Sequence, residues 1–171
     1  MVYDIKKYGS DVLRNKCEPV EEITDEIGEI LENMRETMKA ANGVGLAAPQ
    51  VGINKRFFVC MIGENNILKI INPVITPLSE EKIVFEEGCL SIPGIYKNVN
   101  RYQKIKINYL DENGNPKEME LEDYPAVVVQ HETDHLDGIL FVDKISAVAK
   151  KMIGKKLALL KKNSLKDSKN S

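Results

Sequence analysis

Two histidines and a glutamate form the clearest chemical motif of the chain. His131 and His135 are its only histidines, and Glu132 follows the first of them. On an α-helix, where each residue turns the chain by about 100°, both imidazoles would project from one face and reach a single ion. Glu132 would point to the side, near enough to move a proton without ligating the metal. The motif H-E-x-x-H therefore indicates a metal site, although a solvated histidine pair accounts for these five residues equally well.

A catalytic metal site needs a third protein ligand, and the usual downstream sources are absent from the sequence. Enzymes with this motif take the third ligand from a later glutamate or a later histidine, and neither follows here. Among the later acids, Asp137 is too close along the helix, and Asp167 lies in a polar terminal stretch. Asp143 stays open as a ligand, but the pattern favours a ligand from upstream.

The three cysteines supply the upstream candidates. Cys89 follows a β-like run that ends at Phe85, and Gly88 beside it lets the backbone bend. Cys60 stands within an apolar run, where a small buried side chain is the simpler interpretation, and Cys17 stands in a charged stretch. We therefore expect Cys89 to complete the site. An odd, sparse set of cysteines also argues against disulfides and for a reducing, cytoplasmic location.

These residues must be positioned by helices and strands, and the order of the predicted elements indicates an α+β fold. We expect short, mostly antiparallel sheets around the H-E-x-x-H helix and helices towards both ends. The first helix is expected over Asp25–Ala41, where Thr24 can cap the first turn and Gly43 can end the helix. The H-E-x-x-H helix should begin near Pro125 and end at Gly138. Between these helices lie β-like runs at Arg56–Ile62, Ile67–Ile71, Lys82–Phe85, Lys104–Leu110 and Glu118–Leu121, the last two joined by the turn Asp111–Asn115.

Length and charge limit the classes of protein to consider. The 171 residues are 43% hydrophobic, enough for one folded domain, and no apolar run is long enough to span a bilayer. We expect that domain over residues 1–163, including a helix at about 143–162, and a disordered polar tail over 164–171. The last helix should pack through a stripe of Ile145, Val148, Met152 and Leu159. Eight lysines and one acid occupy residues 150–171, whereas residues 1–149 hold 16 basic and 25 acidic side chains, a net charge of −9.

Three segments together resemble the signature blocks of a known enzyme family, the bacterial-type peptide deformylases. The segments are Gly43–Gln50 (GVGLAAPQ), Glu87–Ser91 (EGCLS) and Gln130–Leu136 (QHETDHL), in the order and spacing of that family. The flanking order of helix, strands and helix is similar as well. The resemblance implies a metal-dependent hydrolase of a linear amide, which removes the formyl group from the N-terminal formylmethionine of nascent proteins and releases formate.

The resemblance also implies roles for individual residues. Cys89 and the two histidines would hold one divalent metal, Fe²⁺ by resemblance, although Ni²⁺, Co²⁺ or Zn²⁺ suit the same ligands. Water would complete the site, and Glu132 would take a proton from that water and return it to the leaving amine. The side-chain amide of Gln50 and the backbone N–H of Leu90 would stabilise the oxyanion.

A formylated methionine needs an apolar pocket, for which the resemblance and helical spacing indicate five residues. They are Val44, Phe85, Tyr124, Val127 and Val128. Gly45 would let the peptide backbone approach, and ordinary core packing explains Val127 and Val128 equally well. We expect Glu87, beside the ligand cysteine, to pair with a base rather than react, with Arg101 as its partner.

The lysine-rich terminus has two interpretations. A run of charge is by default a solvated helix face, but these lysines would also attract ribosomal RNA near emerging chains. Neither a membrane nor DNA is expected as a partner. Two rivals to a deformylase stay open: a metallopeptidase, disfavoured by the missing downstream ligand, and a structural metal site, which needs Cys17 or Cys60 as its fourth ligand.

Overall fold

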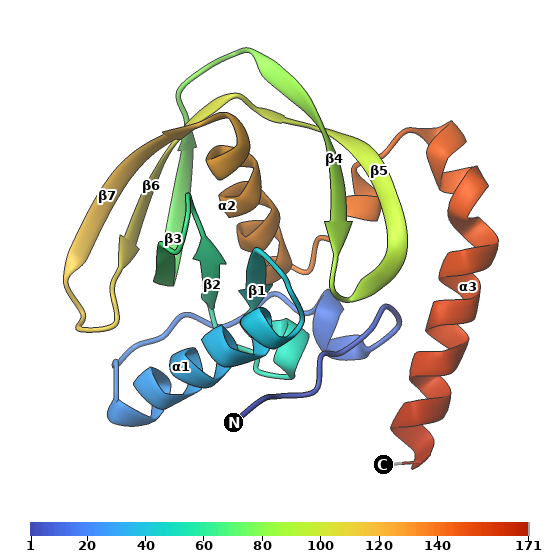
Figure 1. Ribbon diagram of the computed structural model, residues 1–171, viewed down its shortest axis with the longest axis horizontal. Helices are drawn as coiled ribbons and strands as arrows, with labels where there is room; N and C mark the ends of the chain where they lie inside the picture. Colours follow the sequence, from blue (N-terminus) through green and yellow to red (C-terminus); the bar gives the residue numbers. More distant parts are fainter. Residues whose placement is uncertain (171) are drawn as a thin grey trace.

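The computed structural model describes residues 1–170, with the side chains of residues 1–167, and places one helix between two antiparallel sheets (Figure 1). That helix is α2 (Asp123–Leu136), which contains the H-E-x-x-H motif. The larger sheet has the order β1-β2-β3-β6-β7, and the smaller sheet pairs β4 with β5. The predicted α+β fold with antiparallel sheets is confirmed.

The remaining elements have the following bounds. The strands are β1 (Gly45–Ala47), β2 (Phe57–Met61), β3 (Ile67–Pro77), β4 (Lys82–Cys89), β5 (Ile92–Tyr102), β6 (Lys104–Leu110) and β7 (Pro116–Glu122). The other helices are α1 (Asp25–Ala40), α3 (Ala147–Asn170) and the short 3-10 helices η1 (Asp11–Arg14), η2 (Ala48–Val51) and η3 (Phe141–Asp143). Among residues 1–170, none of the helices combines the length and the apolar character that crossing a membrane requires.

Helix α1 ends one residue before its predicted boundary. The Thr24 hydroxyl accepts the N–H of the third helical residue, as an N-cap does. The helix buries one face, with Leu31, Met34, Thr37 and Met38. The predicted stop at Gly43 is wrong in detail, because Asn42 takes the left-handed conformation (φ 56°) after the helix. Gly43 instead lies against the side chain of Leu90, which would clash with a Cβ at this position.

The sheets contain more strand than the sequence predicts. β3 continues past Ile71 to Pro77 through an irregularity between Ile71 and Val74, where its pairing with β6 shifts register. β4 runs on from Phe85 to Cys89, and neither β1 nor β5 was predicted. β5 contains many polar residues, so its own pattern is weak, and its pairing with β4 makes it a strand.

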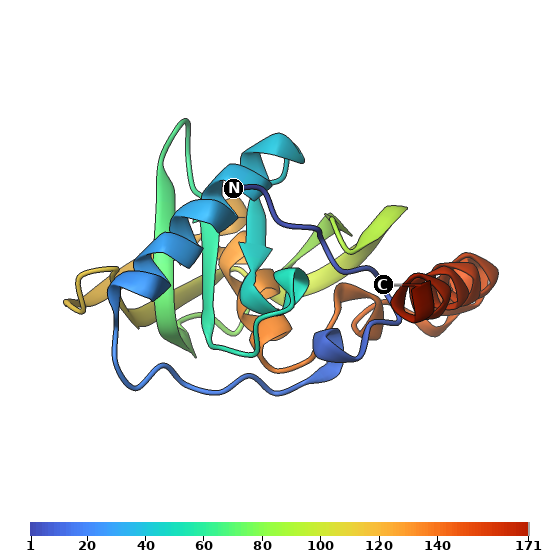
Figure 2. The ribbon, with the colours of Figure 1, turned by 90° about the horizontal axis from the view of Figure 1, so that it is seen from below.

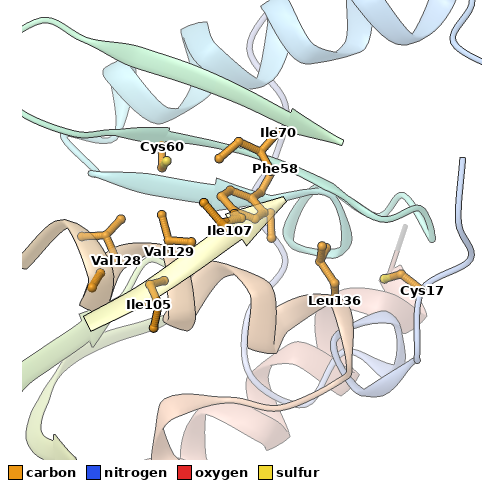
Figure 3. Close-up of a cluster of buried hydrophobic side chains, with 11 residues drawn as sticks. Cys17, Phe58, Cys60, Ile70, Ile105, Ile107, Val128, Val129 and Leu136 are labelled. Atoms are coloured by element: carbon orange, nitrogen blue, oxygen red, sulfur yellow. The ribbon is translucent and has the colours of Figure 1, made fainter. Parts of the chain in front are cut away.

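Two apolar cores lie on opposite faces of the larger sheet because β2 buries both of its faces. Phe58 and Cys60 belong to the core on the α2 side, whereas Phe57 and Val59 belong to the core on the α1 side. Figure 3 shows the first core, where the sheet meets α2 through side chains that include Phe58, Ile70, Ile105, Ile107, Val128, Val129 and Leu136. This packing fixes how α2 is rotated and therefore where its histidines point.

Helix α3 begins and ends later than predicted and packs through a different face. It runs from Ala147 to Asn170, rather than over about 143–162, and residue 171 lies outside the described residues. Figure 2 shows α3 almost end-on at the edge of the molecule. The division of the chain into a domain over 1–163 and a tail over 164–171 stays a prediction.

The predicted apolar stripe of the last helix is wrong apart from Ile145, which is buried. Val148, Met152 and Leu159 are each at least 59% exposed. The packed face lies further round the helix and consists of Ala149, Ile153, Leu157 and Leu160. It contributes to a third core that contains Ile92 and Phe141 and against which Tyr8 packs. Apolar residues occur on several sides of this helix, so spacing alone does not select the packed side.

Candidate metal centre and active site

α2 and the end of β4 bring three metal-binding side chains together. Sγ of Cys89 lies 3.4 Å from Nε2 of His135, and the Nε2 atoms of His131 and His135 lie 3.2 Å apart. One donor atom from each of the three residues lies within 4.8 Å of the others, which is close enough for a single ion. The structure thus places the expected third ligand, Cys89, beside the histidines.

The other candidates for the third or fourth ligand lie elsewhere. Asp143 accepts hydrogen bonds from the guanidinium of Arg14 at 2.6 and 3.1 Å and from the N–H of Leu140 at 2.9 Å. Cys17 and Cys60 are buried in the core between α2 and the larger sheet. Burial raises the pKa of Cys17 to about 11 and the pKa of Cys60 further, so both stay protonated thiols. Neither cysteine supplies the fourth ligand of a closed structural site.

A buried carboxylate orients the first histidine. Oε1 of Glu87 lies 2.8 Å from Nδ1 of His131, which leaves Nε2 of His131 facing the other two ligands. Arg101 donates from Nε and Nη2 to the two oxygens of Glu87, at 2.8 and 2.9 Å, and from Nη1 to Asp134. The predicted pairing of Glu87 with Arg101 is therefore confirmed. A carboxylate behind a ligand histidine holds the ring in one orientation and one tautomer.

The electrostatics of the three ligands favour a cation. Burial alone would raise the pKa of Glu87, but the hydrogen bonds from Arg101 and His131 lower it to about 2, so Glu87 is ionised. Burial lowers the pKa of His135 well below its usual value, which gives the neutral ring that metal ligation requires. Burial also opposes a charge on His131, yet the ligand thiol and two carboxylates raise its pKa. Surroundings that favour a proton on His131 also favour a divalent cation in place of that proton. Cys89, His131 and His135 therefore fit a metal ion.

Glu132 is a buried carboxyl group beside the candidate metal ligands. It is buried, Oε1 lies 3.8 Å from Nε2 of His131, and Oε2 has no hydrogen-bond partner among the described residues. Burial raises the pKa of Glu132 to about 7, so near neutral pH this carboxyl group can both accept and return a proton. Gly45 makes room for it, because a Cβ at this position would clash with the Glu132 carboxylate. The structure thus shows a reason for this glycine that the sequence did not reveal.

Gln50 and Leu90 lie next to Cys89, the candidate third ligand. A lone glutamine is usually a surface residue, but Gln50 is 1% exposed, and its Nε2 lies 3.5 Å from Sγ of Cys89. Leu90 is the residue after Cys89, at the turn between β4 and β5. Both residues line the same cavity as Glu132.

A cavity of about 380 Å³ opens in front of these groups, and all five residues predicted for the methionine pocket line it, as does Gly45. One wall contains Phe85 and Tyr124, whose ring centroids lie 5.1 Å apart. Sequence reasoning missed the lining residues Pro93, Gly94 and Tyr96, because β5 was not predicted. An aromatic residue five positions after the EGCLS block was the available signal for this wall.

Comparisons with known proteins identify the family of this chain. Residues 2–151 match the family model described as polypeptide deformylase. A peptide deformylase of Fusobacterium nucleatum is 57% identical over 164 residues, which are 95% of this chain and 94% of that protein.

Solved structures lead to the same family. The crystal structure of peptide deformylase from Thermus thermophilus has a TM-score of 0.90 at 42% identity and covers 95% of this chain and 99% of that chain. The structure of peptide deformylase from Thermotoga maritima has a TM-score of 0.83 at 46% identity and covers 85% of this chain and 99% of that chain. With the matched residues spanning all three signature blocks, the chain belongs to the peptide deformylase family.

Proposed function

We propose that this protein is a metal-dependent hydrolase that removes the N-formyl group from the formylmethionine of nascent proteins and releases formate. The observation that carries the proposal is the position of Glu132, a buried carboxyl group that lines the cavity beside Cys89, His131 and His135. On one thiolate and two neutral imidazoles, a divalent cation would keep a net charge of about +1 and would remain electrophilic.

The chain's own residues account for the movement of protons and of negative charge. A divalent metal held by the three ligands would supply a Lewis acid that lowers the pKa of water and polarises the formyl carbonyl. Glu132 takes the proton of the attacking water and then passes it to the amine nitrogen that leaves with the peptide. The side-chain amide of Gln50 and the backbone N–H of Leu90 donate to the formyl oxygen as it becomes negative.

The apolar part of the cavity receives the methionine side chain. Its residues are Val44, Phe85, Tyr124, Val127 and Val128. Val128 also belongs to the core between α2 and the larger sheet, so this one side chain both packs in the core and lines the pocket. We assign Gly45 to the same pocket as the place where a peptide backbone comes close.

The direct test is formate release from formyl-Met-Ala-Ser by protein purified anaerobically, with the metal content of the same sample measured. We expect stoichiometric formate and Met-Ala-Ser. Cleavage of an internal peptide bond without formate would instead identify a metallopeptidase. We propose Fe²⁺ as the resident metal, and reconstitution of the stripped protein with Fe²⁺, Ni²⁺, Co²⁺ or Zn²⁺ compares the alternatives that the ligands allow.

Alkylation of the three cysteines tests the ligand assignment without an activity assay. In stripped protein, iodoacetamide should label Cys89, which is partly exposed, and bound metal should protect it. Cys17 and Cys60 should stay unlabelled in both samples, because they are buried and burial raises their thiol pKa values. Mass spectrometry after proteolysis identifies the labelled residue. Equal labelling of Cys89 with and without bound metal would exclude Cys89 as a ligand.

We further propose that α3 brings this protein close to ribosomal RNA in the cytoplasm. Lys151, Lys155 and Lys162 are exposed on the helix, away from the face that packs on the third core. Sedimentation with ribosomes should weaken steeply as salt is raised, and replacement of these three lysines by glutamate should abolish it. This variant keeps the packed face, so salt-independent binding or unchanged binding by the variant would contradict the contact.

A further inference from the structure

Ser91 is a fully buried polar residue that takes part in no step of the proposed reaction. It ends the EGCLS segment, and it is 0% exposed. Burying a hydroxyl costs free energy unless the hydroxyl is hydrogen-bonded. Oγ of Ser91 accepts a hydrogen bond from Nε2 of Gln50 at 3.0 Å. Its partner is thus the residue whose amide faces the developing oxyanion.

The carboxamide of Gln50 has one orientation that satisfies its neighbours. Oε1 accepts the N–H of Ala47 at 2.9 Å, and because only the oxygen of an amide accepts, Nε2 must face the other way. One hydrogen of Nε2 meets Oγ of Ser91, and the other is available on the side of Cys89, whose Sγ is 3.5 Å away. Sulfur is a weak acceptor, so this second hydrogen is free to serve a substrate oxygen.

One segment near the N-terminus fixes the main chain of both residues. The N–H of Tyr8 donates to the carbonyl of Ser91 at 2.8 Å, and the N–H of Lys6 donates to the carbonyl of Gln50 at 2.7 Å. Because Lys6 and Tyr8 belong to one short stretch of chain, the distance between the two side chains is set by hydrogen-bonded backbone. The Ser91–Gln50 contact is therefore built into the fold.

We propose that Ser91 is a positioning residue that holds the carboxamide of Gln50 with one N–H facing the cavity beside Cys89. The proposal rests on the proposed deformylation, in which Gln50 stabilises the oxyanion. Without Oγ of Ser91, the amide is anchored only through its oxygen, and the nitrogen end can turn away. The oxyanion forms only after attack on the formyl carbon, so misplacing its donor lowers kcat and leaves KM nearly unchanged.

A double-mutant cycle between Ser91→Ala and Gln50→Ala tests this coupling. With Gln50 present, S91A should lower kcat for formyl-Met-Ala-Ser by roughly tenfold, as the loss of a supporting hydrogen bond does. In the Q50A protein the same change should lower kcat by less than about twofold, because no amide is left to position. Equal losses in both backgrounds, or no loss with Gln50 present, would overturn the proposal. Ser79→Ala removes another serine hydroxyl that is hydrogen-bonded, to the carbonyl of Glu81 and the N–H of Lys104, but that does not line the cavity, and it should leave kcat unchanged.

Hydrogen exchange of the Gln50 side chain gives a readout that does not depend on activity. In Zn²⁺-loaded protein, the Gln50 amide protons, assigned by their loss in Q50A, should exchange at least about tenfold more slowly than those of a free glutamine. In S91A the exchange should approach the free rate, whereas S79A should not change it. Exchange at the free rate in the unmutated protein would overturn the proposal even where S91A does not fold. Slow exchange without any formate release would refute the proposed function and leave the Ser91–Gln50 contact standing.

Discussion

Helices α2 and α3 have opposite relations to the rest of the molecule. α2 has 14 residues and buries nine of them, because sheets cover it on two sides. α3 has 24 residues, yet only Ile153 and Ser164 are buried among its described side chains. Polar groups of α2 must therefore find partners or accept shifted pKa values, whereas the lysines of α3 up to residue 167 are exposed to water. A helix buried on both sides can hold reactive groups that a helix covered on one side cannot.

Two buried polar residues of α2, two positions apart, differ in whether the protein satisfies their hydrogen bonds. Gln130 donates to the carbonyls of Tyr102 and Ala126 and accepts the N–H of Tyr102, so its side chain is fully engaged in holding β5 to α2. Glu132 leaves Oε2 without a partner among the described residues, and burial raises its pKa to about 7. The unsatisfied group is the one that can serve a substrate.

The largest effect should come from Glu132→Gln in α2. The change keeps the shape of the side chain but removes the base, so turnover should fall by about 10³-fold or more. Metal content should be unchanged, because Glu132 is not among the three ligands. Formate release and metal analysis on the same sample check both expectations, and activity within tenfold of the unmutated protein would exclude Glu132 as the base.

A large loss of stability is expected when the charge network behind α2 is broken. Arg101→Ala leaves Glu87 buried without its counter-charge and should lower the free energy of unfolding by about 3–5 kcal/mol. Arg35→Ala, which breaks an exposed pair with Glu32, should cost less than about 1 kcal/mol. Urea unfolding of both variants measures the contrast. Similar losses for the two arginines would show that burial does not distinguish these pairs.

The packed face of α3 is open to a similar comparison. Ile153→Ala removes a side chain that is 3% exposed and should cost about 2–4 kcal/mol. Met152→Ala, one position away and 69% exposed, should change stability by less than about 0.5 kcal/mol. Thermal unfolding measures both variants. A larger fall in the unfolding temperature for Met152→Ala than for Ile153→Ala would show that the apolar stripe predicted from the sequence is the packed face.

The smallest effect belongs to the contact beside the turn between α2 and α3. Burial opposes ionisation of Asp143, but the hydrogen bonds from Arg14 lower its pKa below the usual 3.8. A lowered pKa contributes stability above the pKa of the unfolded chain, and this contribution is lost as the pH falls below about 3.8. Asp143→Asn should therefore cost less than about 1 kcal/mol at pH 7 and nothing near pH 2. Urea titrations at the two pH values measure it, and a difference that persists at low pH would contradict the ion pair.

Local patterns predicted the elements that form locally. α1, the H-E-x-x-H helix and the β6–β7 hairpin lie within a few residues of their predicted limits, because helical spacing, caps and turn residues act over short distances. β5 was missed because it is a strand only through its pairing with β4. That omission hid Tyr96 and one wall of the cavity.

For the site, the sequence by itself determined the pair His131 and His135, because four-residue spacing places two side chains on one helix face. It favoured an upstream third ligand but left Asp143 open. Only the tertiary structure decided that β4 delivers Cys89 to them, that Gly45 leaves space for Glu132 and that Ser91 holds Gln50. These placements depend on contacts between segments far apart in the chain and on the exclusion of water from the space between those segments. A local sequence pattern contains neither the contacts nor the exclusion of water.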